Sequence, residues 1–359
     1  MEEAEIKYRF AGLKLLVGLA SVMIVAAGLR EAQAVFVPIL FSFFLAMLGT
    51  PGTRYLNKRI GLPKVFAVLI VAAVIIAGLV AIGNLFYGSI QEFRTALPKY
   101  SGNLNALADR LDNQLKDFGL NYSTQMLLDS LGPDAVVDVV SGTLKGLVGA
   151  LSVLVVVLVA MIFMLYEATD FKSKLRIAMG EAFQPSRFES VSTDVQRYVG
   201  IKTVTSLITG ISVGLLNYIM GVDFWLLWGL IAYILNYIPF VGSIIASIPA
   251  IILGFMIGGP GTGVTLIIAY TAINNGISNF LEPVMLGPRL GLSPLVVFLS
   301  LIIWGWIWGP GGALLSVPLT MILKILLEHS EEFHWVAILM NNRVVVAKKK
   351  AASEDPQPA

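Results

Sequence analysis

The stretch VFAVLIVAAVIIAGLVAIGNLF, residues 65–86, contains no charged side chain. As an α-helix it is about 33 Å long, and the hydrocarbon core of a bilayer is about 30 Å thick. The whole chain has the same character, because 57% of its 359 residues are hydrophobic and only 13% are charged. Soluble domains average about half hydrophobic and about a quarter charged residues. With a mean hydropathy of +0.81, the sequence predicts an integral membrane protein and excludes a soluble enzyme.

Other apolar stretches are candidates for further membrane spans. Together with 65–86 they are Leu15–Leu29, Ala34–Leu48, Leu144–Tyr166, Val204–Met220, Phe224–Ile238, Phe240–Ile257 and Val264–Leu281. A final pair, Leu295–Trp308 and Ala313–Leu327, forms helices of about 21–23 Å, too short to cross a bilayer. The Gly309–Gly312 turn between them indicates a re-entrant hairpin. We predict an all-α polytopic membrane protein with about eight transmembrane helices, this C-terminal hairpin and broken helices in the last third.

Basic residues in a short loop set the orientation. Arg54, Lys58, Arg59 and Lys64 follow the second span with no acidic residue among them, so this loop is expected to be cytoplasmic. Counting spans from it places both termini in the cytoplasm. The predicted division is 1–87 for three spans, 88–143 for an extracytoplasmic helical segment, 144–166 for a fourth span, 167–202 for a cytoplasmic amphipathic helical segment, 203–340 for a transport core with Gly-Pro-Gly hairpins, and 341–359 for a basic, disordered cytoplasmic tail.

The core is apolar but repeatedly interrupted. No charged residue occurs between Phe224 and Leu281, yet prolines and glycines recur there. Irregular backbone at membrane depth is tolerated only where protein or a water-filled cavity satisfies it, and broken helices in transporters indicate a binding site. The alternative is ordinary loops between short spans. The hinge or break candidates here and in the final hairpin are Pro239, Gly242, Pro249, Pro260, Pro294 and Pro310.

Polar residues form a stripe after the second break. Thr271, Asn275, Ser278 and Glu282 recur at helical spacing, and Asn274 and Asn279 adjoin them. Lipid cannot cover such a face, so it either bonds to neighbouring helices or lines an aqueous path. Amide and hydroxyl oxygens with one carboxylate suit a small polar solute or a weakly held monovalent cation.

Two members of the candidate set have alternative roles. Glu282 is the expected proton carrier if transport is proton-coupled, but it could equally be an interfacial carboxylate paired with Arg289. Asn236, at the end of a span, is a candidate for the path or simply a capping residue. The substrate-path or ion-path candidates are Asn236, Thr271, Asn274, Asn275, Ser278, Asn279 and Glu282.

Several chemistries are unsupported by the sequence. It contains no Cys and only two His, both near the C-terminus, so we expect no metal site and no cofactor. No phosphate-binding G-x-x-x-x-G-K-[ST] loop exists, which favours a secondary transporter over an ATP-driven one. Neither a serine-type nor an aspartyl-type protease site can be assembled within the spans, and no nucleic-acid partner is expected. A non-transporting membrane scaffold or regulator remains a competing class.

Four stretches resemble the autoinducer-2 exporter family of bacterial membrane proteins. They are GVDFWLLWG (221–229), NYIPFVGSIIASIP (236–249), NFLEPVMLGPRLGLSPLVV (279–297) and WGPGGALLSVPLT (308–320). The resemblance implies an oligomeric inner-membrane exporter. Some members of that family are assigned to efflux of the signal autoinducer-2, and other members to exchange of sodium or lithium for protons. Gly242-Ser243 stands where many relatives have Gly-Pro, which weakens a second rigid break there.

Overall fold

The computed structural model describes residues 2–117, 154–168, 170–179, 185–286, 292–328, 330 and 332–341. These residues form helices and no strand, apart from one isolated bridge between Leu292 and Asn341. The prediction of an all-helical membrane protein is confirmed. Its extracytoplasmic segment beyond residue 117 and its tail beyond residue 341 lie outside the described residues, as does the start of the predicted fourth span.

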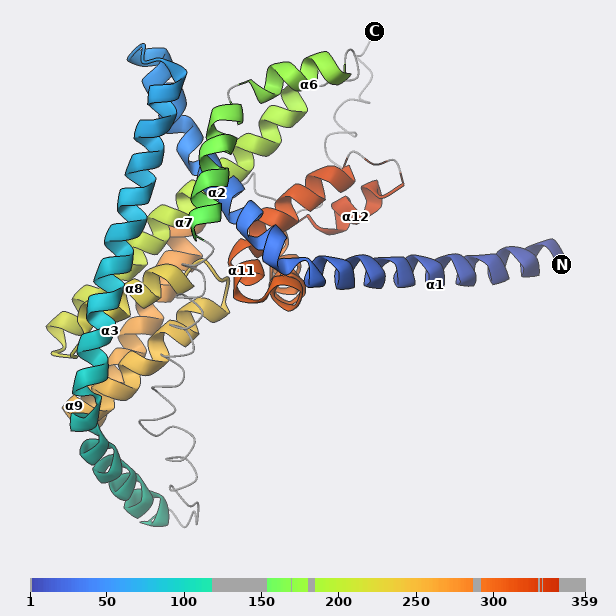
Figure 1. The fold of residues 1–359 in the computed structure, drawn as a ribbon. Helices are drawn as coiled ribbons and strands as arrows, with labels where there is room; N and C mark the ends of the chain where they lie inside the picture. Colours follow the sequence, from blue (N-terminus) through green and yellow to red (C-terminus); the bar gives the residue numbers. More distant parts are fainter. Residues whose placement is uncertain are drawn as a thin grey trace, which may run out of the picture.

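Helical elements follow one another along the described chain, and most of them are labelled in Figure 1. They are α1 (Glu2–Glu31), α2 (Gln33–Arg59), α3 (Lys64–Asp117), α6 (Phe171–Met179), α7 (Pro185–Ile219), α8 (Trp225–Leu235), α9 (Val241–Asn275), the π-helix η2 (Gly276–Leu281), α10 (Glu282–Leu286), α11 (Pro294–Glu328) and α12 (His334–Leu339).

Five helices in the described part of the chain are long and apolar enough to cross a membrane. They comprise Gln33–Arg59, Lys64–Phe93, Thr193–Ile219, Val241–Met285 and Pro294–Glu328. Two shorter apolar helices, Leu154–Ala168 and Trp225–Leu235, accompany them. The predicted total of about eight transmembrane helices and the re-entrant path of the final hairpin therefore stay predictions. The described part of the predicted extracytoplasmic helical segment, residues 88–117, continues α3 without a break.

The two longest candidate membrane spans, which contain α9 and α11, are each folded at a glycine. In α9, Gly259 has φ 74° and ψ −169°, and in α11, Gly309 has φ 60° and ψ −146°. This backbone region is essentially open to glycine alone. A proline follows each break, where its fixed φ suits the first turn of the next helical arm. A Cβ on Gly263 would lie 2.3 Å from the Phe255 ring, so the two arms of α9 lie side by side, as Figure 1 also shows.

The other predicted hinges lie in varied settings. Pro239 and Gly242 flank the tight turn from α8 into α9, where Phe240 has a positive φ. Pro249 lies inside the first arm of α9. The backbone stays helical there, because Gly259 is the residue of α9 with non-helical φ and ψ. Pro294 begins α11. The structure thus places backbone breaks at the Gly-Pro pairs and at the α8–α9 turn.

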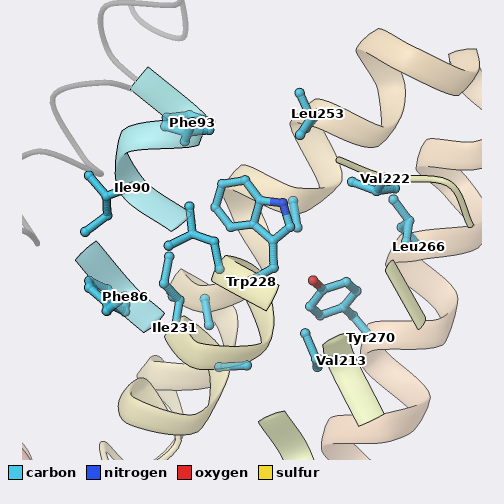
Figure 2. Close-up of a cluster of buried hydrophobic side chains, with 14 residues drawn as sticks. Phe86, Ile90, Phe93, Val213, Val222, Trp228, Ile231, Leu253, Leu266 and Tyr270 are labelled. Carbon is cyan, nitrogen blue, oxygen red and sulfur yellow. The ribbon is translucent and has the colours of Figure 1, made fainter. Parts of the chain in front are cut away.

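The largest buried cluster joins α3, α7, α8 and α9. The side chain of Trp228 is fully buried in this cluster, and its ring packs edge-on against Phe93 from α3. Phe86 of α3 belongs to the same cluster (Figure 2). The hydroxyl of buried Tyr270 accepts a hydrogen bond from Asn217 Nδ2 at 2.7 Å. Close approach of α7 and α8 depends on glycine, since a Cβ on Gly229 would lie 2.8 Å from the Gly210 carbonyl oxygen.

The tip of α11 is held against the junction of α1 and α2. Trp308 Nε1 donates a hydrogen bond to the Leu29 carbonyl at 2.9 Å, and Gln33 Nε2 donates one to the Trp308 carbonyl at 3.3 Å. The Trp308 ring also stacks on Trp304 and Phe36. Beyond this junction α1 extends away from the other helices (Figure 1).

Candidate functional site

The carboxylate of Glu282 forms a buried ion pair with Lys202. Glu282 opens α10 and Lys202 lies in α7, so the pair joins two elements far apart in the sequence. Lys202 Nζ lies 2.9 Å from Oε2 and 3.1 Å from Oε1, and the two side chains are only 7% and 14% exposed. Charges at membrane depth are costly unless paired. The alternative partner Arg289 lies outside the described residues. In the structure Glu282 is paired with Lys202.

Neighbouring groups strengthen this junction between α7 and α10. Arg197 Nη2 donates a hydrogen bond to the Met285 carbonyl at 3.2 Å. Tyr198 is buried one helical turn before Lys202. On the following turn, Thr203 Oγ1 accepts a hydrogen bond from Tyr237 Oη at 2.8 Å. The ion pair is therefore part of a wider polar contact between α7, the α8–α9 turn and α10.

The polar stripe lies on the outside of the chain. Thr271, Asn275, Ser278 and Asn279 are all exposed, and Asn274 is half-buried. Thr271 Oγ1 donates to the Ile267 carbonyl at 2.7 Å, Asn275 Nδ2 donates to the Thr271 carbonyl at 2.9 Å, and Asn279 Nδ2 donates to Asn275 Oδ1 at 2.9 Å. These bonds run along the stripe's own helix, so the side chains keep an uncharged polar face directed outward.

A π-helical turn carries the end of the stripe and leads directly into Glu282. Residues 276–281 form η2, a rare element that often marks functional sites. Pro283 gives a physical reason for it, because proline has no N–H to bond the Asn279 carbonyl and its ring crowds an α-helical turn. One extra residue in a turn rotates the downstream side chains about the helix axis by about 100°. Glu282 consequently faces α7, whereas simple α-helical spacing predicts that it shares the face of Thr271 and Asn275.

A second polar face, which sequence reasoning missed, is buried along α7. Its buried polar residues are Lys202, Thr205, Ser206, Thr209 and Asn217. Asn236, one of the predicted path residues, is buried against it and donates from Nδ2 to Ser206 Oγ at 3.0 Å. A signal was present in the sequence, since Lys202, Thr205, Ser206 and Thr209 are related by three- and four-residue steps and Asn217 follows two helical turns later. The predicted boundary at residue 202 hid the pattern by dividing α7 between a cytoplasmic segment and a span.

Comparison with known proteins bears on this arrangement. A family model described as "AI-2E family transporter" matches residues 16–332. A putative transport protein of Haemophilus influenzae is 36% identical over 336 residues, covering 92% of this chain and 96% of that protein. The AI-2 transport protein TqsA of Escherichia coli K12 is 33% identical, covering 92% and 96%. The putative transport protein YhhT of the same strain is also 33% identical, covering 92% and 94%.

Proposed function

Because the chain belongs to the AI-2E family of membrane transporters, we propose that it is a secondary transporter that exports a small polar solute along the stripe on α9 and η2. The observation that carries this proposal is the exposed set of Thr271, Asn275, Ser278 and Asn279 within an otherwise apolar membrane helix. Lipid offers such groups no hydrogen bonds, whereas a passing hydroxylated solute does.

The similarity to a protein named as an AI-2 transporter suggests the solute class. At 33% identity across almost both whole chains, the relative supports autoinducer-2 as the first cargo to assay. The stripe offers amide and hydroxyl groups without a formal charge of its own, which suits a neutral hydroxylated molecule better than a strongly charged one.

The test is a flux assay in proteoliposomes with labelled autoinducer-2. Two threonines of α9 provide a matched pair of variants: both are exposed, and both hydroxyls bond the carbonyl four residues earlier, at 2.7 Å for Thr271 and 2.8 Å for Thr265. Thr271 belongs to the stripe and Thr265 does not. We expect Thr271→Val and Asn275→Leu to lower flux while Thr265→Val leaves it unchanged. Equal effects of the two threonine variants would contradict the proposed path.

Flux assays in the same proteoliposomes distinguish two alternative functions from solute export. Exchange of sodium or lithium for protons is the second candidate function, and Glu282, 14% exposed beside the stripe, supplies a carboxylate for it. Sodium flux driven by an imposed pH difference, lost in Glu282→Gln, would favour that function. Intact protein with neither flux would favour a scaffold or regulatory role.

The proposal includes a homo-oligomer in the bacterial inner membrane. A second copy would cover apolar side chains of the projecting α1, among them the exposed Val22, Met23 and Ile24. Mass measurement of the solubilised protein by light scattering tests this point.

Cytoplasmic termini are also part of the proposal. The exposed Arg54, Lys58 and Arg59 at the α2–α3 turn support a cytoplasmic position for that end. Because the chain has no natural Cys, Lys58→Cys can be labelled from either side of the membrane. Labelling from the periplasmic side alone would reverse the proposed orientation.

A further inference from the structure

The ion pair on α7 and α10 occupies the position that a free cation would take at Glu282. Lys202 Nζ lies 2.9 Å and 3.1 Å from the two carboxylate oxygens, so it sits between both. A monovalent cation bound by both oxygens would need the same place. The ammonium group is held there by its own side chain and is 7% exposed.

We propose that Lys202 is a specificity-determining residue: it is a tethered internal cation that fills the Glu282 site and restricts the transporter to neutral solutes. The inference rests on the proposed function and narrows its substrate class. A competing sodium ion would have to lose its water and displace a covalently tethered ammonium, and the displaced charge would then remain buried without a partner. Neutral solutes meet no such barrier, since they need not break the pair.

The geometry of η2 supports this division. Asn279 is exposed on the stripe, whereas Glu282, three residues later, is turned inward to Lys202. The solute-facing surface therefore carries amide and hydroxyl groups, and the nearby Glu282 carboxylate is neutralised by Lys202 from the inner side. Two further residues of α7 lie near the pair. Tyr198 is buried, and Arg197 donates a hydrogen bond to the Met285 carbonyl. A Glu282 carboxylate without a partner would attract cations. The Lys202 ammonium occupies the carboxylate and thereby excludes them.

The experiment measures binding of radioactive sodium to purified protein in detergent, with choline chloride holding the ionic strength constant. Wild-type protein and Lys202→Arg are expected to show no saturable sodium binding. Lys202→Gln is expected to gain a saturable sodium site that raises the bound sodium roughly tenfold or more above the wild-type background, and adding Glu282→Gln is expected to abolish the gain. Thermal melting supplies a second readout, because sodium should stabilise Lys202→Gln and not the wild type.

The outcomes are distinct from those of the solute flux assay. If the wild type binds sodium saturably and Glu282→Gln abolishes that binding, the inference is refuted by these two measurements alone. A folded Lys202→Gln protein with no sodium site would overturn it as well. If Lys202→Gln does not accumulate, the charge-swapped double variant Lys202→Glu with Glu282→Lys is titrated with sodium instead. Its lysine still fills the carboxylate, so saturable sodium binding by this variant would contradict the inference. Absence of autoinducer-2 flux with these binding results intact would instead refute the proposed cargo.

Discussion

Breaking the Lys202–Glu282 pair from one side should destabilise the protein more than removing both charges. The two atoms Nζ and Oε2 are 2.9 Å apart, and at an effective dielectric constant of about 20 such charges attract by about 6 kcal/mol. Most of that attraction offsets the cost of desolvation. Removing one partner of a buried pair leaves the other uncompensated and costs about 3–5 kcal/mol. We expect this loss of unfolding free energy for Lys202→Met and for Glu282→Gln.

A double-mutant cycle measures the interaction itself. The double variant should lose less stability than either single variant, because no isolated charge remains buried. The matched control is the Lys64–Asp170 pair, whose N···O distance is shorter at 2.6 Å but whose side chains are 22% and 57% exposed. Distance alone ranks the control pair as stronger. Burial ranks it as weaker, at about 0–1 kcal/mol, because water screens exposed charges.

Equilibrium unfolding in mixed micelles is the assay for both cycles, and activity is not needed to read it. A coupling energy for Lys202 and Glu282 that is no larger than that for Lys64 and Asp170 would refute the reasoning. In that case, the buried pair would contribute no more than a solvated one, and its role in holding α10 against α7 would be lost.

Three further predictions use the same unfolding assay. Gly229→Ala should destabilise by about 1–3 kcal/mol, because its methyl group would lie 2.8 Å from the Gly210 carbonyl, while Gly78→Ala, with no atom within 4 Å of its Cβ, should be neutral or slightly stabilising. Gly309→Ala should cost about 1–3 kcal/mol because its φ of 60° disfavours a side chain; an unchanged midpoint would contradict the strain argument. Pro283→Ala should let the α-helix continue through η2 and reduce the Lys202–Glu282 coupling energy, and a coupling energy equal to the wild-type value would show that Pro283 does not hold the turn.

The class of fold and the hairpin tips followed from local properties of the sequence. Hydrophobic length requires only counting, and a Gly-Pro pair such as Gly309-Pro310 encodes both the unusual φ and the start of the next helix. The stripe also followed from spacing, because Thr271 and Asn275 lie on a regular stretch of α9. Such features depend on neighbours within a few residues, which a single sequence displays directly.

The partner of Glu282 could not be predicted in the same way. Its contact with Lys202 depends on how α7 packs against α10, and Arg289 was nearer in sequence. The Glu282-Pro283 pair was a local signal for an irregular turn that α-helical spacing ignored. Extending the helical pattern through Pro283 put the carboxylate on the wrong face. The irregular turn lies before Pro283, whereas Pro249 lies within a regular helical arm, so a proline alone does not tell whether the helical phase shifts.

The π turn gives residues 271–286 two opposed faces with different electrostatics. Without it, Glu282 would continue the line of Asn275 and leave Lys202 buried without a counter-charge, a state that costs several kcal/mol. With it, the outward face retains neutral hydrogen-bonding groups and the inward face holds a compensated charge. The irregular backbone and the ion pair are therefore interdependent: Pro283 directs Glu282 inward, and Lys202 makes that inward position stable. Any conformational change that straightens η2 must also separate this pair, which couples the shape of the outward polar face to the contact between α7 and α10.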